Sequence, residues 1–529
     1  MTDHLILSAL PTPNGELHLG HLGGPFLAAD ALARHLRAEG HRVTTVSATD
    51  GWESYVLDAA RREERSPQET ARAYHAAIET ALIAADCEPD VFLDVRTEPT
   101  ASDHGDWHHW LTERLTARDR VEIRGERLLA DASTGEELIA CWLAGRCPGC
   151  GEGVAGYTCE ACGMWFQPDG VRDPRPRHPR SGIRTTETSS AFLRLDAGLL
   201  VRMARERRVP DEYVDLIHRY VELNGPVWRL THPLGWGVPW STGPGLPPRQ
   251  VHSTYALGTT AMFLSAGEQY ARLHGLSRNP FLSEVHDRPL FALCFGMDGA
   301  LPLLMQLAVQ EAAEVPSAPD AYRFNQFMTL DGEKFSTSRG HVIRVLDWVD
   351  AGLDTDALRF HLARLSPGEK PTDFTAERFA DDVTQTLVGR LGRVLDLCEV
   401  DRRQESSSDP ASVRARYETI AARHRRAFAT GDLAEAAAAV DDWIGAAPDA
   451  VGAAGARGVL AVLAALAAPL MPRWANVVWK RLALPGGPAL RAAGELLSRP
   501  GGFLPVPAHQ LRFDPVSPDA VRALTPQTR

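Results

Sequence analysis

The most constraining feature of this sequence is an apolar run at 4–10 that ends in a loop rich in helix breakers at 11–15. A helical pattern follows from 17 to 38, Gly40 caps it, and a second apolar run covers 43–47. A strand, a helix and a second strand in this order predict a parallel β-α-β unit. Ligands of such sheets bind where strands end and helices begin, so the loop at 11–15 is expected to line a ligand site.

Two histidines, His18 and His21, lie three residues apart at the start of this helix. That spacing places both imidazoles on one face of a helix whose free N–H groups and partial positive charge suit phosphates. Gly20 between them allows a purine to approach the backbone closely. We infer that the two imidazoles donate to a triphosphate as charge develops on the α-phosphorus. The alternative is a surface helix with two incidental histidines.

A second loop, residues 330–340, carries one lysine and a cluster of hydroxyl side chains. A mobile cation that contacts a triphosphate only in the transition state raises the rate without binding ATP too tightly. An ordinary exposed turn is the alternative interpretation. The side chains concerned are Lys334, Phe335, Ser336, Thr337 and Ser338.

Together the two stretches resemble the signatures of one family. Residues 9–21 resemble the HIGH signature of class I aminoacyl-tRNA synthetases, in the form Pro-x-x-Asn-Gly-x-x-His-Leu-Gly-His that is typical of methionyl-tRNA synthetases. Residues 334–338 resemble the KMSKS loop, with Thr337 in place of the second lysine of the bacterial pattern. The resemblance extends over about residues 1–500. It implies activation of an amino acid by Mg²⁺-bound ATP to give aminoacyl-AMP.

The resemblance also implies three groups of site residues. The catalytic residues are His18, His21, Lys334 and Thr337. The ATP site comprises Pro11, Asn14, Gly15, Gly20, Gly296, Asp298, Phe335, Ser336 and Ser338. The amino acid site comprises Ala9, Leu10, Thr12, Asp50, Ser253, Ala256, Thr260, Gly299 and Leu303.

Asp50, at the end of the second strand, matches the family aspartate that binds the α-ammonium group, although a helix N-cap is the alternative role. The rest of the amino acid site departs from the family, because Thr12, Ser253 and Thr260 stand at positions of aromatic residues. Methionine is recognised by apolar and aromatic packing, and each lost contact costs about 1–3 kcal/mol. We therefore expect a larger or more polar amino acid. Met297 replaces a family lysine beside the ATP site.

Four of the eight cysteines form two Cys-x-x-Cys pairs separated by eight residues. Each pair directs two sulfur atoms at one point, and four thiolates fill the tetrahedral coordination of zinc. We therefore predict a structural zinc site, with reduced free thiols as the alternative. Methionyl-tRNA synthetases carry such a knuckle in their connective insertion, so the resemblance agrees. The predicted ligands are Cys147, Cys150, Cys159 and Cys162.

The predicted fold is a Rossmann-like α/β class I catalytic domain with a zinc-knuckle connective insertion, followed by an all-α bundle. Within the catalytic domain, 53–95 and 101–118 are expected to be helical. The expected segments are a catalytic domain at 1–118 and 234–323, an insertion at 119–233, a linker with the KMSKS-like loop at 324–375, an anticodon-binding-like bundle at 376–500 and a tail at 501–529.

Charge and hydropathy restrict the partners of the chain. The formal net charge of -12 opposes a broad non-specific nucleic-acid surface. The first residues lack the basic segment of a signal peptide, and no run of 18 apolar residues is evident. We expect a cytoplasmic protein with no membrane partner.

Bundle positions at which the family reads anticodon bases have changed in this sequence. Thr384, Gly389, Arg393 and Asp449 replace or follow the expected asparagines and tryptophan. We therefore expect the aminoacyl group to pass to a small nucleophile or an unusual carrier in specialised metabolism. The chain resembles the synthetase-like part of hydrazine-forming enzymes, which implies a separate cupin-type partner. A methionine–tRNA ligase that charges tRNA(Met) and an inactive binding module remain as alternatives.

Overall fold

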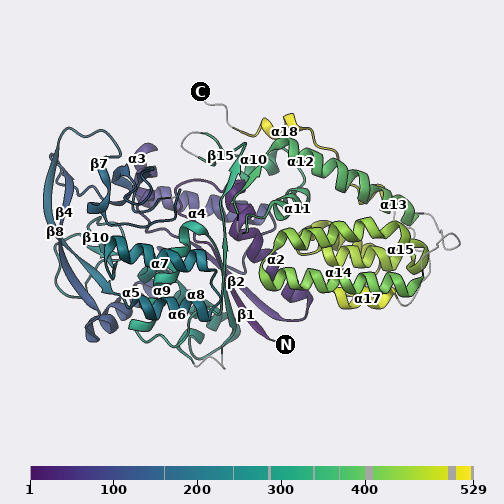
Figure 1. Cartoon of the computed structure of the whole chain (residues 1–529), viewed down its shortest axis with the longest axis horizontal. Helices are drawn as coiled ribbons and strands as arrows, with labels where there is room; N and C mark the ends of the chain where they lie inside the picture. Colours follow the sequence, from purple (N-terminus) through teal and green to yellow (C-terminus); the bar gives the residue numbers. More distant parts are fainter. Residues whose placement is uncertain are drawn as a thin grey trace.

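The structure of the chain, a computed structural model, has an α/β part and an all-helical part side by side along its longest axis (Figure 1). The strands of the first 330 residues occupy one end, and the helices of residues 392–497 occupy the other. The described residues are 2–159, 161–241, 243–283, 288–336, 340–368, 370–399, 409–497 and 508–525.

Five parallel strands form the central sheet, in the spatial order β13-β12-β1-β2-β3. Ile6 on the middle strand lies opposite Thr45 on one side and Ala292 on the other. The strand order reverses between β1 and β12, so ligands are expected at the carboxyl ends of these two strands. The predicted α/β class is confirmed. The strands are β1 (Asp3–Ser8), β2 (Arg42–Thr49), β3 (Val91–Asp94), β12 (Leu290–Gly296) and β13 (Ala321–Asn325).

The helix expected from 17 to 38 is interrupted near its start. Gly24 leaves helical geometry with φ −92° and ψ −113°, and Pro25 follows it. A Cβ atom on Gly24 would lie 2.7 Å from the Asn325 amide nitrogen, so the close packing of this turn on β13 requires glycine. Glycine and proline both weaken an α-helix, which explains the break. The segment consists of α1 (Leu19–His21), a π-helical turn (Leu22–Phe26) and α2 (Leu27–Ala38).

Residues 53–95 are not all helical, contrary to the expectation from the sequence. Residues 91–94 form β3, which pairs with β2 at the edge of the sheet. The helix α4 ends at Ala84, and the short apolar run after Pro89 is a strand signal that the helical pattern upstream obscured. The helices observed in and after this region are α3 (Tyr55–Arg62), α4 (Pro67–Ala84) and α5 (Thr100–Ala117).

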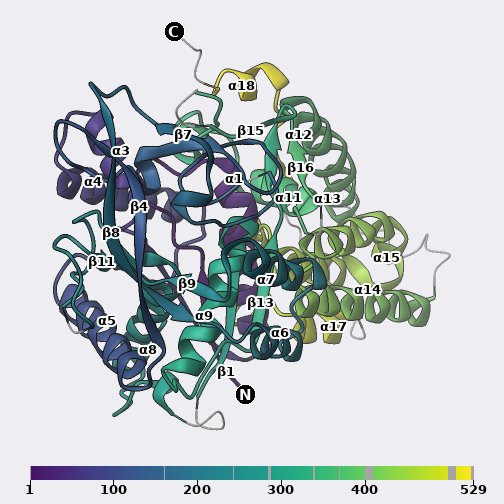
Figure 2. The same cartoon turned by 60° about the vertical axis from the view of Figure 1, so that its left-hand side comes forward.

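Residues 119–233, the predicted connective insertion, contain long strands that lie at the far end of the molecule from the bundle (Figures 1 and 2). Its strands are β4 (Val121–Asp131), β8 (Ile183–Arg194) and β9 (Val227–Arg229) in one antiparallel sheet, with β5 (Leu143–Arg146), β6 (Gly153–Ala155) and β7 (Arg172–Pro176) in a second. Two helices were not expected here, because the turns around them dominate the sequence pattern. They are α6 (Ala197–Glu206) and α7 (Asp211–Asn224), and both pack on α9 (Ala300–Ala312).

The carboxy-terminal part is helical, as predicted. Among the described residues, α15 alone is long and apolar enough to be a candidate membrane span, and 72% of its most apolar window is buried in the protein. Burial among the other helices accounts for its composition. The helices are α12 (Ala376–Asp382), α13 (Gly392–Glu399), α14 (Pro410–Thr430), α15 (Leu433–Ala467), α16 (Pro472–Arg481), α17 (Leu490–Leu497) and α18 (Pro518–Arg522).

One arginine joins the two parts. Arg359, on α11 (Thr355–Leu365), is 0% exposed and pairs with Asp30 of α2 at 2.5 Å. Its guanidinium also donates to the backbone carbonyls of Ala85, after α4, and Leu470, before α16, each at 3.1 Å. A buried guanidinium needs partners for all its N–H groups, so this side chain fixes the bundle against the sheet domain.

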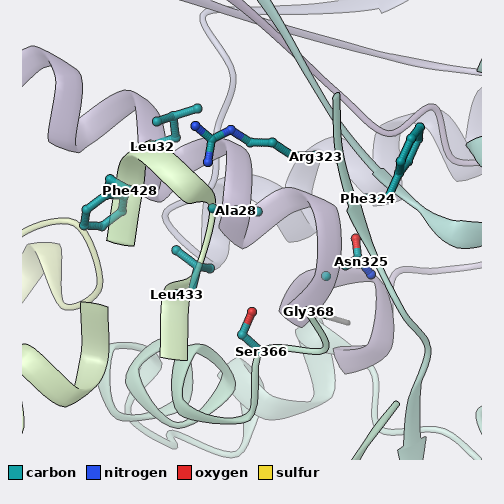
Figure 3. A pocket seen from close by; sticks show the side chains of 11 residues that line it. Ala28, Leu32, Arg323, Phe324, Asn325, Ser366, Gly368, Phe428 and Leu433 are labelled. Atoms are coloured by element: carbon teal, nitrogen blue, oxygen red, sulfur yellow. The ribbon is translucent and has the colours of Figure 1, made fainter. Parts of the chain in front are cut away.

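A small cavity of about 30 Å³ lies at the same junction (Figure 3). It lies between α2, β13 and the start of α15, and the Arg323 side chain extends along it. Burial lowers the pKa of Arg323. None of the predicted site residues lines this cavity, and its volume suits a water molecule rather than a substrate.

Candidate active site

The two predicted signatures are joined through their backbones. Leu19 donates its N–H to the carbonyl of Ile343 at 3.0 Å, and Val345 donates to Leu17 at 3.0 Å. Ile343 and Val345 follow the second loop, and the Arg344 side chain between them pairs with Glu16 at 2.9 Å. The segments are more than 300 residues apart in sequence but form one short ladder. This ladder brings the lysine loop to the start of α1.

Around that ladder, the side chains of His18, His21, Lys334 and Phe335 converge. The His18 ring stacks on His21 with centroids 3.8 Å apart, and on Phe335 at 4.7 Å with 5° between the planes. Burial, and then the charge of Lys334, lower the pKa of His21 to about 4. Burial, His21 and Lys334 lower the pKa of His18 well below its usual value. Both imidazoles are therefore neutral at pH 7, and each has one N–H to donate.

The structure gives a packing reason for Gly20, and its predicted contact with a purine stays a prediction. A Cβ atom on Gly20 would lie 3.0 Å from the Phe335 ring and 3.1 Å from the His18 ring, so glycine permits this stacking. The helix start also offers fewer free donors than predicted, because α1 has three residues and its first N–H is bonded to Ile343.

The lysine loop is closed at its base. Lys334 lies on β15 (Glu333–Lys334), which pairs with β14 (Met328–Leu330). Ser336 and His341 exchange two backbone hydrogen bonds, of 2.9 and 3.0 Å. The predicted residues Thr337 and Ser338 lie outside the described residues.

The predicted amino acid residues gather at the carboxyl ends of β1 and β2. Asp50 follows β2, and its N–H donates to the Pro11 carbonyl at 3.0 Å. The Ser47 hydroxyl donates to the Ala9 carbonyl at 3.0 Å, which ties the same two strand ends together. Leu10 and Thr12 follow β1 in this loop, with Asn14 and Gly15 in the turn that continues it. The sheet therefore brings the Asp50 carboxylate beside the predicted ATP loop.

Asp50 has a carboxylate neighbour that sequence reasoning missed. Burial, and then the charge of Glu53, raise the pKa of Asp50 well above its usual value. Glu53 is 4% exposed, and its two oxygens accept from the Ser54 hydroxyl at 2.6 Å and the Thr254 hydroxyl at 3.2 Å. Tyr255 also donates its hydroxyl to Glu53. An acid three residues after Asp50, in the same turn, was the available signal.

Ser253, Ala256 and Thr260 lie in and after a kinked turn at 254–258. The Ser253 hydroxyl accepts from the Tyr255 N–H at 3.2 Å, and the Thr260 hydroxyl donates to the Ala256 carbonyl at 2.6 Å. Both hydroxyls are thus engaged within the turn. Ala256 has a positive φ of 54°, a strained conformation that is found most often at functional sites. Their predicted contact with an amino acid stays a prediction.

On the other side of the point where the strand order reverses, β12 ends at Gly296, and the remaining predicted residues follow it. Asp298 has an exposed side chain, whose carboxylate accepts from the Gly299 N–H at 3.1 Å. Leu303, in α9, is 2% exposed and belongs to the core of the sheet domain. Met297 lies close to Gly163 of the insertion, where an added Cβ would be 3.4 Å from its methyl carbon.

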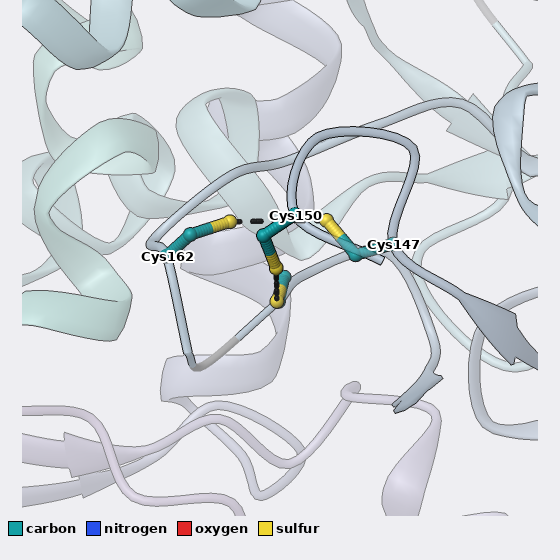
Figure 4. A group of neighbouring side chains, drawn as sticks. Cys147, Cys150 and Cys162 are labelled. Atoms are coloured by element: carbon teal, nitrogen blue, oxygen red, sulfur yellow. Dashed lines mark hydrogen bonds between the residues drawn. The ribbon is translucent and has the colours of Figure 1, made fainter. Parts of the chain in front are cut away.

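The four clustered cysteines meet at one point, as predicted (Figure 4). Their sulfur atoms lie within 4.8 Å of one another, with Cys147 to Cys162 at 3.8 Å and Cys150 to Cys159 at 3.5 Å. A tetrahedron with 2.3 Å zinc–sulfur bonds has edges of about 3.8 Å, so the donor set fits zinc. Four protein ligands leave no position for a reacting molecule, which makes the site structural.

This knuckle supports the residues around Glu53. Thr158 pairs with Trp165 across the second Cys-x-x-Cys turn, and the Trp165 ring packs edge-on against Tyr255 at 4.4 Å. Tyr157, next to Thr158, forms a 2.7 Å hydrogen bond with His232. The knuckle therefore holds part of the wall beside the candidate amino acid site.

The fold and these clusters define a nucleotide-binding α/β domain with a cysteine-knuckle insertion and a helical bundle. The family model described as tRNA synthetases class I (M) matches residues 4–251 and 304–398. The chain belongs to the class I tRNA synthetases.

Its relatives include several methionine–tRNA ligases. That of Methanopyrus kandleri is 26% identical over 406 residues, which cover 73% of this chain and 58% of that protein. That of Bifidobacterium adolescentis is 26% identical over 463 residues, which cover 82% and 73%. The chain spans less than two thirds of the length of the first of these relatives.

A solved structure has the same fold over nearly the whole chain. Mycobacterium tuberculosis methionyl-tRNA synthetase in complex with methionyl-adenylate matches with a TM-score of 0.75 and 19% identity. The match covers 96% of this chain and 99% of that one. The likeness extends to the insertion and the helical bundle, and at this identity it establishes the fold alone.

Proposed function

We propose that this chain is a ligase that joins an amino acid to ATP, forming an aminoacyl-adenylate and releasing pyrophosphate. The observation that carries the proposal is the convergence of His18, His21 and Lys334 at the carboxyl edge of the parallel sheet, beside Asp50. Family membership and relatives that are methionine–tRNA ligases support the same chemistry.

In the proposed reaction, a carboxylate oxygen of the amino acid attacks the α-phosphorus of ATP. A bond forms between that oxygen and phosphorus, and the bond from phosphorus to the bridging oxygen breaks, so pyrophosphate leaves with its electron pair. The neutral imidazoles of His18 and His21 donate N–H groups, and Lys334 supplies positive charge as the pentavalent state develops. Asp50 holds the α-ammonium group. Mg²⁺ enters with ATP and offsets phosphate charge.

Thr337 and Ser338, which follow Ser336 in the sequence, are assigned to the same step. The family pattern has two lysines in this loop. Thr337, at the second of these positions, carries no charge, so Lys334 is the cation that the pair of positions contributes. The ATP site is assigned to Pro11, Asn14, Gly15, Gly20, Gly296, Asp298, Phe335, Ser336 and Ser338.

The activated amino acid is proposed to be other than methionine. Support comes from the hydroxyl residues Thr12, Ser253 and Thr260 at aromatic positions of the family, and from the two carboxylates near Thr254. A thioether side chain gains nothing from such polar surroundings. The aminoacyl group is then proposed to pass to a small nucleophile or an unusual carrier, with a separate cupin-type partner for any later step.

A second candidate is a methionine–tRNA ligase that charges tRNA(Met), which the names of the relatives favour. The two candidates are separated by ATP–pyrophosphate exchange with a panel of amino acids, followed by acylation of purified tRNA. The lead proposal expects exchange that is faster with another amino acid than with methionine, and no methionyl-tRNA. Robust methionyl-tRNA formation would support the second candidate instead. Absence of exchange with every amino acid would contradict ligase activity altogether.

A further inference from the structure

Glu53 differs from the other buried carboxylates of the sheet domain and insertion in having no cationic partner. Asp30 pairs with Arg359 at 2.5 Å, Asp58 with Arg177 at 3.5 Å, and Asp131 with Arg180 at 3.4 Å. Among the residues that the structure describes, no lysine, arginine or histidine forms an ion pair with Glu53. Its partners are neutral: the hydroxyls of Ser54, Thr254 and Tyr255, and the Ser54 N–H at 2.7 Å.

Asp50 lies close to this unbalanced charge. The hydroxyl of Thr254 donates to Glu53 at 3.2 Å and also bonds the Asp50 carboxyl. The Glu53 N–H also donates to the Asp50 carbonyl at 3.2 Å, so the two residues share one turn and their carboxyls are neighbours. Two carboxylates this close repel each other when both are ionised, and the raised pKa of Asp50 reflects that repulsion after burial.

A substrate with one ammonium group balances only one of these charges. Its α-ammonium group would pair with Asp50 and leave the Glu53 charge buried among hydroxyls, at a cost in free energy. A substrate with a second ammonium group balances both. The short separation of the carboxyls requires the two amines to be close together, so the second amine must end a short side chain.

We propose that Glu53 is a specificity-determining residue that selects a short-chain diamino acid, such as 2,3-diaminopropionate, 2,4-diaminobutyrate or ornithine. Glu53 binds the side-chain ammonium while Asp50 binds the α-ammonium group, and Thr254 fixes the spacing between the two. This inference rests on the proposed adenylate-forming activity. It names the substrate class for the same site, and it assigns to Glu53 the binding of the side-chain ammonium group.

The test uses the full-length protein and ATP–pyrophosphate exchange at limiting amino acid. Each diamino acid is paired with the amino acid that has a methyl group in place of the side-chain amine: 2,3-diaminopropionate with 2-aminobutyrate, 2,4-diaminobutyrate with norvaline, and ornithine with norleucine. The expected result is at least about a tenfold higher kcat/KM for one diamino acid than for its partner, because a charge-assisted hydrogen bond is lost in the partner.

Glu53→Gln is expected to reduce that preference at least about tenfold, because it keeps the shape of the side chain and removes its charge. Glu88→Gln, which changes an exposed residue in the segment before β3, is the matched control and should leave the preference unchanged. Thermal unfolding of each variant checks that it is folded.

The outcomes separate the two levels of the proposal. Exchange that is equal or faster with the uncharged partners contradicts the diamino acid assignment and leaves adenylate formation standing. A diamino acid preference that survives Glu53→Gln contradicts the role of Glu53. If Glu53→Gln does not fold, the wild-type comparison of paired substrates still decides the substrate class. Exchange with no amino acid at all contradicts the proposed function itself.

Discussion

The imidazole of His18 stacks on the ring of Phe335 at 4.7 Å with 5° between their planes. This contact joins the start of the first helix to a loop that follows more than 300 residues later. Phe335 is the neighbour of Lys334, so the stacking also determines where the lysine leaves the backbone. Lys334, the proposed catalytic cation, is thereby held on the same side of the sheet edge as the two imidazoles.

The first prediction concerns Lys334. Lys334→Ala is expected to lower kcat of ATP–pyrophosphate exchange by about a hundredfold, with a smaller effect on KM for ATP, because the lost charge acts chiefly in the transition state. Steady-state exchange kinetics at varied ATP measure both constants. Lys480→Ala, an exposed change on α16, is the control and should retain wild-type kinetics. An unchanged kcat in Lys334→Ala would contradict a role of this loop in the reaction.

The second prediction concerns pH. The amino acid binds to ionised Asp50, whose pKa is raised by burial and by Glu53. Since a raised pKa means protonation at a higher pH, kcat/KM for the amino acid should fall as pH drops through this pKa. The pKa of His21 is about 4, so the imidazoles stay neutral over the upper part of the pH range in which kcat/KM falls. A pH profile of exchange at limiting amino acid measures it.

The same profile tests the coupling of the two carboxyls. Glu53→Gln removes the like charge, so the pKa of Asp50 should fall and the acid limb should move to lower pH. Asp50→Asn should abolish the limb together with most of the activity. An acid limb at the same pH in wild type and Glu53→Gln would show that the two groups do not interact.

The third prediction concerns the knuckle. Cys150→Ser is expected to reduce bound zinc, measured by elemental analysis, because the site loses one of four thiolates. It should also raise KM for the amino acid more than KM for ATP, since Trp165 packs on Tyr255 beside the amino acid site. Cys398→Ser, a buried cysteine of the helical bundle, is the control. Zinc loss with an unchanged amino acid KM would contradict this link.

Sequence motifs predicted the active-site neighbourhood more reliably than they predicted its details. His18, His21 and Asp50 are short-range features: a strand, a breaker loop and a helix start define their positions. Glu53 was missed because its partner Thr254 lies about 200 residues away and only the tertiary fold brings them together. Residues near the point where the strand order reverses come from strands that are distant in sequence. The periodicity of apolar residues carries no information about contacts between them.

In the fold too, features set by the local sequence were predictable and features set by distant contacts were not. The strands β1 and β2 were predictable because their apolar runs are short and bounded by breakers. Strand β3 was not, because its apolar run has only four residues and the helical pattern upstream obscures it. The break at Gly24 could not be predicted either. The glycine is required by close packing against Asn325, which is distant in the sequence.

The fourth prediction compares two arginines that cross the same domain boundary. Arg359 is fully buried and pairs with Asp30, whereas Arg425 of α14 is exposed and pairs with Glu39 at 3.3 Å. Arg359→Met leaves Asp30 and several backbone carbonyls buried without their main donor, which should cost about 3–5 kcal/mol of unfolding free energy.

Arg425→Met breaks an exposed pair and should cost no more than about 1 kcal/mol. Urea unfolding of both variants, followed by tryptophan fluorescence, gives the two values. Arg359→Met should also uncouple the bundle from the sheet domain and produce two transitions, because its guanidinium bonds elements of both. A single transition with equal losses in the two variants would mean that the apolar contacts between the parts, rather than the buried guanidinium, hold them together.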